Sequence, residues 1–160
     1  MPIKKIIYHH SILNLFDFEI EKFGIIETGG VLLGKTEKEC IYISKAIGSG
    51  PKAIHEDIYF RADSNYIDMM IDIEYANSNG EISYIGEWHT HPQIHPEPSY
   101  KDLQSLSEIT ESSGKENLLL IIGAINYQKS KFINQSISII KNPERTNFYL
   151  PDVLVSNEFK

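Results

Sequence analysis

The sequence predicts an α/β fold in which helices flank a mixed β-sheet, and three observations support this prediction. Apolar residues recur at three- and four-residue intervals in several separate stretches, which is typical of amphipathic helices. Apolar runs of strand length, either continuous or alternating, lie between and after those stretches. Helices and strands therefore follow one another in mixed order along the chain, which favours a sheet with helices packed against it.

Length and composition indicate a single domain over residues 1–160, long enough to bury a core. Acidic residues outnumber basic ones by 22 to 15, giving a net charge of -7, which argues against nucleic acid or an anionic membrane as partner. Cys40 is the only cysteine, so the chain has no internal disulfide and a cysteine-based zinc site is disfavoured. The N-terminal stretch does not resemble a signal peptide and no segment is apolar enough to span a membrane, so we expect a cytoplasmic protein.

The first quarter of the chain predicts a strand and a helix, followed by a hairpin of two further strands. Residues 3–8 form a short strand, and Ser11 is a plausible N-cap for a helix that Gly24 ends. The inward face of this helix consists of Leu13, Phe16, Ile20 and Phe23. A buried strand follows at residues 31–33, and residues 40–44 form a second strand that pairs with it as a hairpin.

The next section predicts a long loop and a second helix. Residues 46–62 contain several chain breakers and are expected to form a loop; the breakers are Gly48, Gly50 and Pro51. Residues 63–65 can cap a helix that ends at Asn79 and Gly80. One face of this helix carries Ile67, Met70, Ile71 and Glu74.

Residues 81–91 are expected to form the central strand. Its period of two places Ile85, Glu87, His89 and His91 on one side. The same period places Tyr84, Gly86, Trp88 and Thr90 on the other side, where the aromatic residues are expected in the core. The strand must stop after residue 91, because the prolines that follow lack the backbone donor a sheet requires; these are Pro92, Pro96 and Pro98.

The remainder of the chain predicts a third helix and two more strands. The helix runs from Ser99 to about Gly114, with an apolar face of Leu103, Leu106 and Ile109. Residues 118–125 are continuously apolar and predict a strand buried on both faces. Apolar residues occupy most of the alternate positions over residues 132–140, which predicts a strand with one face more exposed to solvent. Residues 146–155 fit no single element.

His89 and His91 form the centre of a predicted metal site. Residues i and i+2 of a strand point to the same side, so both imidazoles can face one point. Asp102 can add a carboxylate from the first turn of the following helix, and two nitrogens with one oxygen match a catalytic zinc site. His-x-His alone is weak, and Ser99-x-x-Asp102 alone is better explained as a helix capping box. Since the cap and the metal would both need Asp102, the two roles compete.

Together these residues resemble the JAMM motif of the JAB (MPN-plus) metalloproteases. Glu27 precedes His89-Thr90-His91, and seven residues separate His91 from Ser99. The stretch at residues 27–34 is similar to the first conserved strand of that family. The sequence Gly-Glu-Trp-His-Thr-His-Pro at residues 86–92 is similar to its compact prokaryotic branch. The resemblance extends from about residue 12 to about residue 140.

This resemblance implies a cytidine-deaminase-like α/β/α sandwich and a zinc-dependent isopeptidase or peptidase with one zinc ion per chain. In the family pattern His89, His91 and Asp102 bind zinc, Glu27 is the general acid and base, and Ser99 supports the oxyanion. Two alternatives to these assignments exist. Glu87 shares the strand face of the histidines and could be the base, although its position favours a supporting role, and His95 is expected at the rim of the site.

The implied reaction is hydrolysis of an amide bond after the C-terminal tail of a ubiquitin-like or otherwise conjugated protein, as in bacterial anti-phage conjugation systems. One alternative is a peptidase that processes a small sulfur-carrier protein. Another is a non-catalytic MPN scaffold, which is disfavoured because scaffold members generally lack metal ligands and here every ligand is present. The chain lacks the long insertions with which eukaryotic relatives hold ubiquitin, so the identity of the protein substrate is left open.

Overall fold

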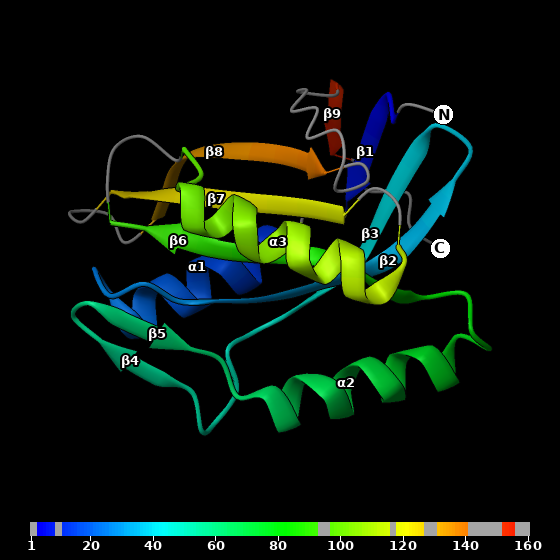
Figure 1. Ribbon diagram of the computed structural model, residues 1–160. Helices are drawn as coiled ribbons and strands as arrows, with labels where there is room; N and C mark the ends of the chain where they lie inside the picture. The colour runs from blue at the N-terminus through cyan, green and yellow to red at the C-terminus, as the bar shows by residue number, and fades with distance from the viewer. Residues whose placement is uncertain are drawn as a thin grey trace.

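The computed structural model describes residues 3–8, 11–92, 97–115, 118–126, 131–140 and 152–155. The helices are α1 (Ser11–Phe23), α2 (Ser64–Asn77) and α3 (Tyr100–Ser113). The strands are β1 (Lys5–Tyr8), β2 (Gly29–Glu37), β3 (Cys40–Ile47), β4 (Ile54–Glu56), β5 (Tyr59–Arg61), β6 (Ser83–His91), β7 (Leu118–Asn126), β8 (Lys131–Ile140) and β9 (Asp152–Val155). Seven strands form a curled mixed sheet in the order β8-β7-β6-β2-β3-β1-β9, and β4 and β5 form a separate hairpin (Figure 1). The predicted α/β class is confirmed.

Local signals set the C-terminal ends of α1 and α3 and the N-terminal ends of α2 and α3, as predicted, whereas α1 begins at Ser11 itself rather than after it. Gly24 follows α1 with a φ of 62°, and Gly114 follows α3 with a φ of 65°, a left-handed conformation that glycine adopts without strain. Asp63 caps α2 by accepting a hydrogen bond from the Tyr66 amide at 3.2 Å. Ser99 caps α3 in the same way. In the described part of the chain, no helix has the length and apolar character needed to cross a membrane.

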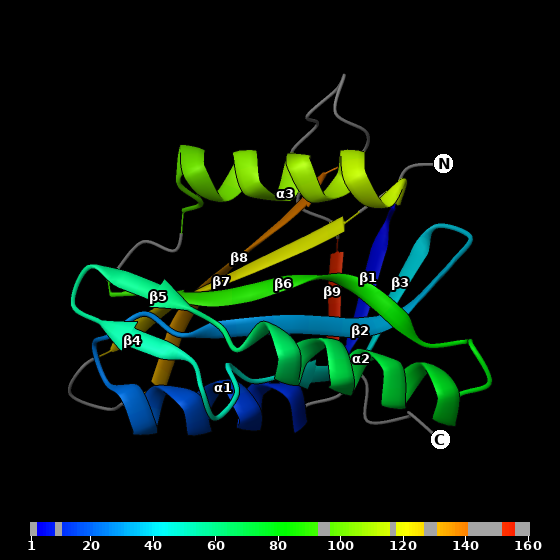
Figure 2. The same cartoon turned by 60° about the horizontal axis from the view of Figure 1, so that its bottom comes forward.

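The alternation along β2 divides the core between the two sides of the sheet. Leu32 packs in the cluster that contains Phe16 of α1, whereas Val31 and Leu33 pack in the cluster that contains Ile67 of α2. A third cluster joins α3 to the start of β7. Figure 2 shows the sheet lying between α1 and α3. β6 lies inside the sheet, antiparallel to β2 and parallel to β7.

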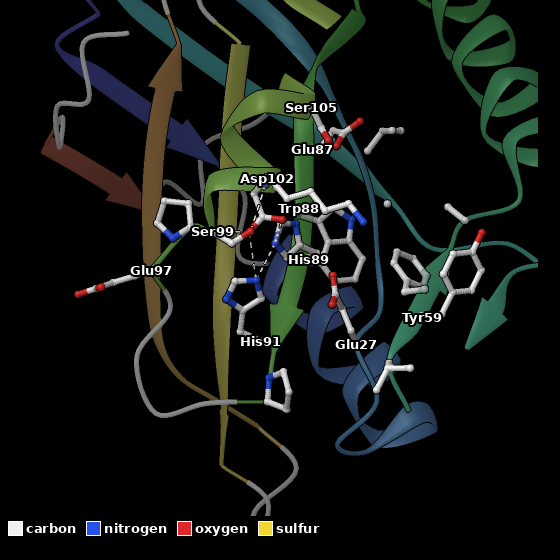
Figure 3. A pocket seen from close by; sticks show the side chains of 18 of the residues that line it. Glu27, Tyr59, Glu87, Trp88, His89, His91, Glu97, Ser99, Asp102 and Ser105 are labelled. Atoms are coloured by element: carbon white, nitrogen blue, oxygen red, sulfur yellow. Dashed lines mark hydrogen bonds and ion pairs between the residues drawn. The ribbon is translucent and has the colours of Figure 1, made fainter. Parts of the chain in front are cut away.

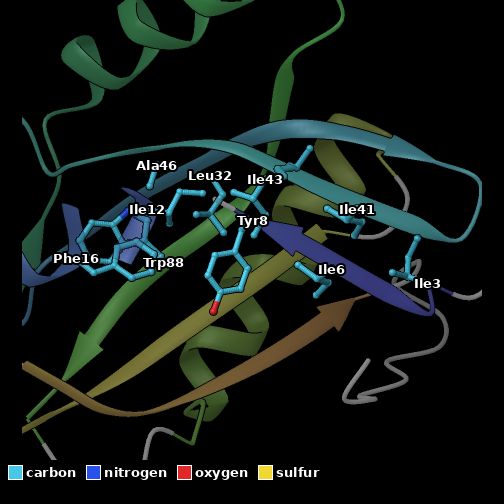
Figure 4. Packing of buried hydrophobic residues seen from close by; sticks show 11 residues of the cluster. Ile3, Ile6, Tyr8, Ile12, Phe16, Leu32, Ile41, Ile43, Ala46 and Trp88 are labelled. Atoms are coloured by element: carbon cyan, nitrogen blue, oxygen red, sulfur yellow. The ribbon is translucent and has the colours of Figure 1, made fainter. Parts of the chain in front are cut away.

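Trp88 fixes β6 to the core beneath α1. Its side chain is 1% exposed, and its ring stacks on Phe16 with centroids 4.4 Å apart (Figure 4). The indole nitrogen donates a hydrogen bond to the Ile47 carbonyl oxygen at 3.0 Å, so the polar end of the ring is also satisfied. Because Trp88 is adjacent to His89, this anchor holds the functional end of β6 in place.

The segment at residues 46–62 differs from the predicted loop. β3 continues to Ile47, and β4 pairs antiparallel with β5 between Ile54 and Arg61. Each of these two strands has only three residues. A run that short has no readable period, which is why the hairpin could not be predicted from the sequence pattern.

The predicted alternation of β6 was wrong at Tyr84 and Ile85. The register with β2 shifts there, so that Leu33 is opposite Tyr84 while Leu32 is opposite Gly86. An extra residue in one strand reverses the side to which its neighbours point. Ile85 therefore packs in the Trp88 cluster, and the Tyr84 hydroxyl donates to Glu87 at 3.3 Å. The assignment of Glu87, His89 and His91 to one side is unaffected.

Of the three C-terminal strands, two were predicted from the sequence and one was not. β7 and β8 confirm the strands predicted at residues 118–125 and 132–140. β9 lies within the stretch that fitted no single element, and it pairs in parallel with β1 at the edge of the sheet. A four-residue edge strand receives its partner from a segment more than a hundred residues away, and no local pattern encodes that pairing.

Candidate metal and active site

The two histidines converge at the C-terminal end of β6. Their Nε2 atoms lie 3.0 Å apart, and His89 is only 9% exposed (Figure 3). The strand period brings both rings to the same side of the sheet, as expected. Two imidazole nitrogens at this distance can share one metal ion.

Asp102 completes the group from the first turn of α3. Its Oδ1 lies 3.5 Å from His89 Nε2, and its Oδ2 lies 3.4 Å from His91 Nε2. The same carboxylate closes the capping box, because Oδ2 accepts the Ser99 amide hydrogen at 2.8 Å. A carboxylate offers about four lone-pair sites, so one side chain can serve the helix end and a metal together. The cap and a metal-binding role are therefore compatible in the geometry of Asp102.

The electrostatics of the group favour a deprotonated carboxylate. Burial raises the pKa of Asp102, but hydrogen bonds from His89, His91 and Ser99 outweigh that effect and hold it well below its usual value. The hydrogen bond to Asp102 raises the pKa of His91 above its ordinary value, although burial opposes the rise. An ionised Asp102 beside the two imidazoles is the form that can bind a cation.

The donor set fits a divalent metal ion. Ligands bound at about 2.0–2.1 Å in a tetrahedral site lie about 3.3–3.4 Å from one another. The separations of 3.0, 3.4 and 3.5 Å between His89, His91 and Asp102 bracket that value. Glu27 is also close, with a carboxylate oxygen within 4.8 Å of a nitrogen of each histidine. Asp102, at 3.4–3.5 Å from the two imidazole nitrogens, and Glu27 are therefore the two carboxylates beside the histidine pair.

The backbone around Glu27 sets its position beside the histidines. Three hydrogen bonds join Thr28 to Thr90. The Thr90 amide donates to the Thr28 carbonyl oxygen at 2.9 Å, Thr90 Oγ1 donates to the same oxygen at 3.4 Å, and the Thr28 amide donates to Thr90 Oγ1 at 3.1 Å. The next residue, Gly29, lies directly opposite His89 in the β2–β6 register. Glu27 therefore lies across from the end of β6, close to both rings (Figure 3).

Glu87 and Ser99 occupy different parts of the same cleft. Burial raises the pKa of Glu87, and its carboxylate accepts a hydrogen bond from Tyr84 on the core side. The Ser99 hydroxyl oxygen accepts a hydrogen bond from the Asp102 amide at 3.1 Å. A hydroxyl that accepts one hydrogen bond can still donate another, so Ser99 retains a donor for a ligand in the cleft. His95 lies outside the described residues.

The cleft has a volume of about 820 Å³ and is bounded by α3 on one side and the β4–β5 hairpin on the other. The hairpin contributes an apolar wall made of Ile58, Tyr59 and Phe60. Ile58 is 99% exposed, so this wall is open to solvent. Sequence reasoning expected residues 46–62 to cover the site as a flap, but it did not single out these lining residues or Glu97, because it treated the hairpin as a loop and the segment before Ser99 only as a spacer.

Two histidines on a strand end, a carboxylate from the next helix and a second carboxylate beside them are a donor set typical of hydrolytic metal sites, here on an α/β scaffold. The chain belongs to the prokaryotic homologues of the JAB domain, whose family model matches residues 21–136. The predicted family and fold are thereby confirmed, and the protein is a hydrolase of the metalloprotease type.

Relatives with descriptive names support the same class. The chain is 24% identical over 136 residues to a CD-NTase/cGAS isopeptidase of Escherichia coli (strain TW11681), covering 85% of this chain and 86% of that protein. It is 36% identical over 89 residues to probable metalloprotease y4qB of Sinorhizobium fredii, covering 54% of each. The solution structure of protein DSY2949 from Desulfitobacterium hafniense has a similar fold, with a TM-score of 0.62, 12% identity and coverage of 97% of this chain and 95% of that one.

Proposed function

We propose that this protein is a zinc-dependent isopeptidase that hydrolyses the amide bond after the C-terminal tail of a conjugated protein. One observation carries the proposal: His89, His91 and Asp102 lie within 3.5 Å of one another at the end of β6, with Glu27 beside them in an open cleft. In this proposal His89, His91 and Asp102 hold zinc, and Glu27 and Ser99 are the catalytic residues.

The roles follow from the chemistry of the side chains. When bound, zinc supplies Lewis-acid activation of water and of the substrate carbonyl group. Glu27 accepts a proton from the attacking water and later delivers it to the leaving amine. Ser99 donates a hydrogen bond to the carbonyl oxygen as negative charge develops there. Asp102 keeps α3 in place through the capping box while one of its oxygens faces the metal position.

The cleft suits an extended peptide. The β4–β5 hairpin borders the cleft, and strand β5 carries Tyr59 and Phe60 of the apolar wall. An extended tail can add to a strand edge through backbone hydrogen bonds while neighbouring pockets read its side chains. Because Ile58 at the hairpin tip is almost fully exposed, a folded donor protein can approach from that side.

Three relatives have the same name, and that name suggests a substrate for this chain. Proteins of Escherichia coli, Vibrio cholerae and Enterobacter hormaechei, 24–26% identical to this chain, are called CD-NTase/cGAS isopeptidases. By analogy, we assign to this chain a conjugate in which the C-terminal tail of a CD-NTase is joined to an amine. Removal of that conjugate would give the protein a role in anti-phage defence.

The test combines substrate capture with chemistry. The Glu27→Gln variant, expressed with a CD-NTase and its conjugation enzymes, should retain an uncleaved conjugate that mass spectrometry can map. Zinc-loaded wild-type protein should then cleave the captured conjugate at the tail, a chelator should stop cleavage, and added zinc should restore it. Serine and cysteine protease inhibitors should have no effect. Cleavage inside a folded domain, or no cleavage by the zinc-loaded protein, would contradict the proposal.

A further inference from the structure

A buried carboxylate lies behind the proposed catalytic glutamate. Glu19 is on the inward face of α1 and is 6% exposed, although its neighbours on that face are apolar. Its Oε2 accepts hydrogen bonds from the Thr28 hydroxyl at 2.8 Å and from the Ser49 hydroxyl at 3.1 Å. A buried carboxylate is costly unless hydrogen bonds compensate for the lost water. These two hydroxyls provide that compensation from two different segments of the chain.

The Thr28 hydroxyl connects Glu19 to the β4–β5 hairpin. A hydroxyl has one hydrogen, and when Glu19 is ionised that hydrogen is donated to its carboxylate. His55 Nε2 lies 3.0 Å from the Thr28 oxygen, which can accept a hydrogen bond from the Nε2–H tautomer while its own hydrogen is donated to Glu19. The His55 ring also stacks on Phe23 of α1, with centroids 3.5 Å apart and an interplanar angle of 9°. The side chain of Thr28 is thus fixed by α1 and by the hairpin.

The backbone of Thr28 is fixed from the other side. Its amide and its carbonyl oxygen both bond to Thr90, which lies between His89 and His91. Thr28 is fully buried and is bonded covalently to Glu27. Any rotation of the Thr28 backbone would therefore move Glu27 relative to the two histidines.

We propose that Thr28, held by Glu19, is a positioning residue that sets the location of the Glu27 carboxylate for proton transfer. This inference rests on the proposed function, because it assigns the proton transfer to Glu27. Thr28 does not contact the substrate; it acts through the backbone that carries Glu27. A small displacement of a catalytic group is enough to lower the rate, because proton transfer requires hydrogen-bonding distance.

A matched pair of variants separates positioning from general stabilisation. Thr28→Val and Ser49→Ala each remove one hydroxyl from Glu19 and leave the other in place. Only Thr28 is bonded to Glu27, whereas Ser49 lies before the hairpin and does not line the cleft. Thr28→Val also removes the contact with His55, so it should lower the melting temperature at least as much as Ser49→Ala does. Zinc content should equal that of wild type in both, since neither residue is a ligand.

The kinetic readout uses the conjugate captured with Glu27→Gln. Thr28→Val should lower kcat about tenfold with KM changed less than about twofold. Ser49→Ala should keep kcat within about twofold of wild type, and Thr28→Ser, which restores the hydroxyl, should recover most of the lost rate. Equal kcat values for Thr28→Val and Ser49→Ala, measured at a temperature where both variants are folded, would overturn the inference.

A second readout does not depend on activity. Hydrogen–deuterium exchange at residues 26–30 should be about fivefold faster in Thr28→Val than in wild type, and unchanged in Ser49→Ala. If the exchange difference appears but zinc-loaded wild type cleaves nothing, the proposed function has failed and the positioning of this segment stands. If wild type cleaves and neither exchange nor kcat distinguishes the two variants, the positioning inference alone has failed.

Discussion

Gly29 lies directly opposite His89 in the antiparallel pairing of β2 and β6, and a Cβ at Gly29 would be 2.8 Å from the His89 Cβ. That distance is too short for two carbon atoms, and the added Cβ would also overlap the Trp88 carbonyl oxygen. The absence of a side chain at Gly29 is therefore what allows the two strands to approach at the metal end of the sheet.

The first prediction concerns this close approach. Gly29→Ala should push β2 and β6 apart beside His89 and weaken zinc binding at least about tenfold, because ligand geometry controls affinity. Gly24→Ala is the control, because Gly24 has a left-handed backbone conformation with open space around it. This substitution should lower stability by about 1 kcal/mol and leave zinc affinity unchanged. Competition with a chromogenic chelator measures the affinities. Equal zinc affinity in the two variants would show that the approach of the strands does not set the metal site.

The second prediction concerns the ligands. Purified wild type should hold about one zinc per chain, and a His89→Ala/His91→Ala variant should hold none. Asp102→Asn can still accept the Ser99 amide hydrogen, so it should retain helix α3 while binding zinc less tightly. Elemental analysis measures the metal, and circular dichroism measures the helix. Zinc content unaffected by the double histidine change would disprove the assignment.

The third prediction distinguishes the two glutamates. Glu27→Gln should retain zinc and lose about 10²–10⁴-fold in hydrolysis rate, because it removes proton transfer without removing a ligand. Glu87→Gln should have a much smaller effect, because its carboxylate is buried and bonded to Tyr84. Rates are measured on the captured conjugate at equal zinc occupancy. The reverse order of effects would identify Glu87 as the base.

The fourth prediction separates the two roles of Ser99. Ser99→Ala removes the N-cap and the hydroxyl, so it should lower stability by about 1 kcal/mol and the rate by about a hundredfold. Ser99→Gly retains most of the capping preference and should lower stability by only a few tenths of a kcal/mol with the same loss of rate. Urea unfolding and the hydrolysis assay supply the two measurements. A rate that follows stability across the pair would mean that Ser99 acts only as a cap.

The fifth prediction concerns pH. Burial lowers the pKa of His55 from its ordinary value of 6.5, an effect that Glu19 opposes and Lys22 supports. The unfolded chain therefore binds this proton at a higher pH than the folded chain does. The stability gained from keeping His55 neutral is fully present above pH 6.5 and is lost as the pH falls through the folded pKa.

His55→Phe tests this dependence, because it keeps a ring on Phe23 but cannot bind a proton. Relative to wild type, its free energy of unfolding should rise as the pH falls from about 7 to about 5. Urea unfolding at several pH values measures the difference. A constant difference across that range would show that His55 has the same pKa in the folded and unfolded chains.

The sequence by itself determined the elements whose hydrophobic pattern extends over several repeats or whose ends carry strong signals. The α1 face is readable because four apolar residues repeat at helical spacing before Gly24. The strand period alone placed His89 and His91 on one side, and the spacing to Asp102 brought the third ligand candidate into the same motif. The sequence pattern was enough to place these residues because they lie within one helix or strand, or are separated by one short loop.

Only the tertiary structure decided the relations between segments distant in sequence. The shift of register at Tyr84 comes from pairing with β2, and the β4–β5 hairpin is too short to have a period of its own. The hydrogen bonds between Glu19 and Thr28 and between Thr28 and Thr90 join α1, the segment before β2, and β6. Such contacts depend on where the packed backbone brings two side chains, and sequence periodicity carries no information about that distance.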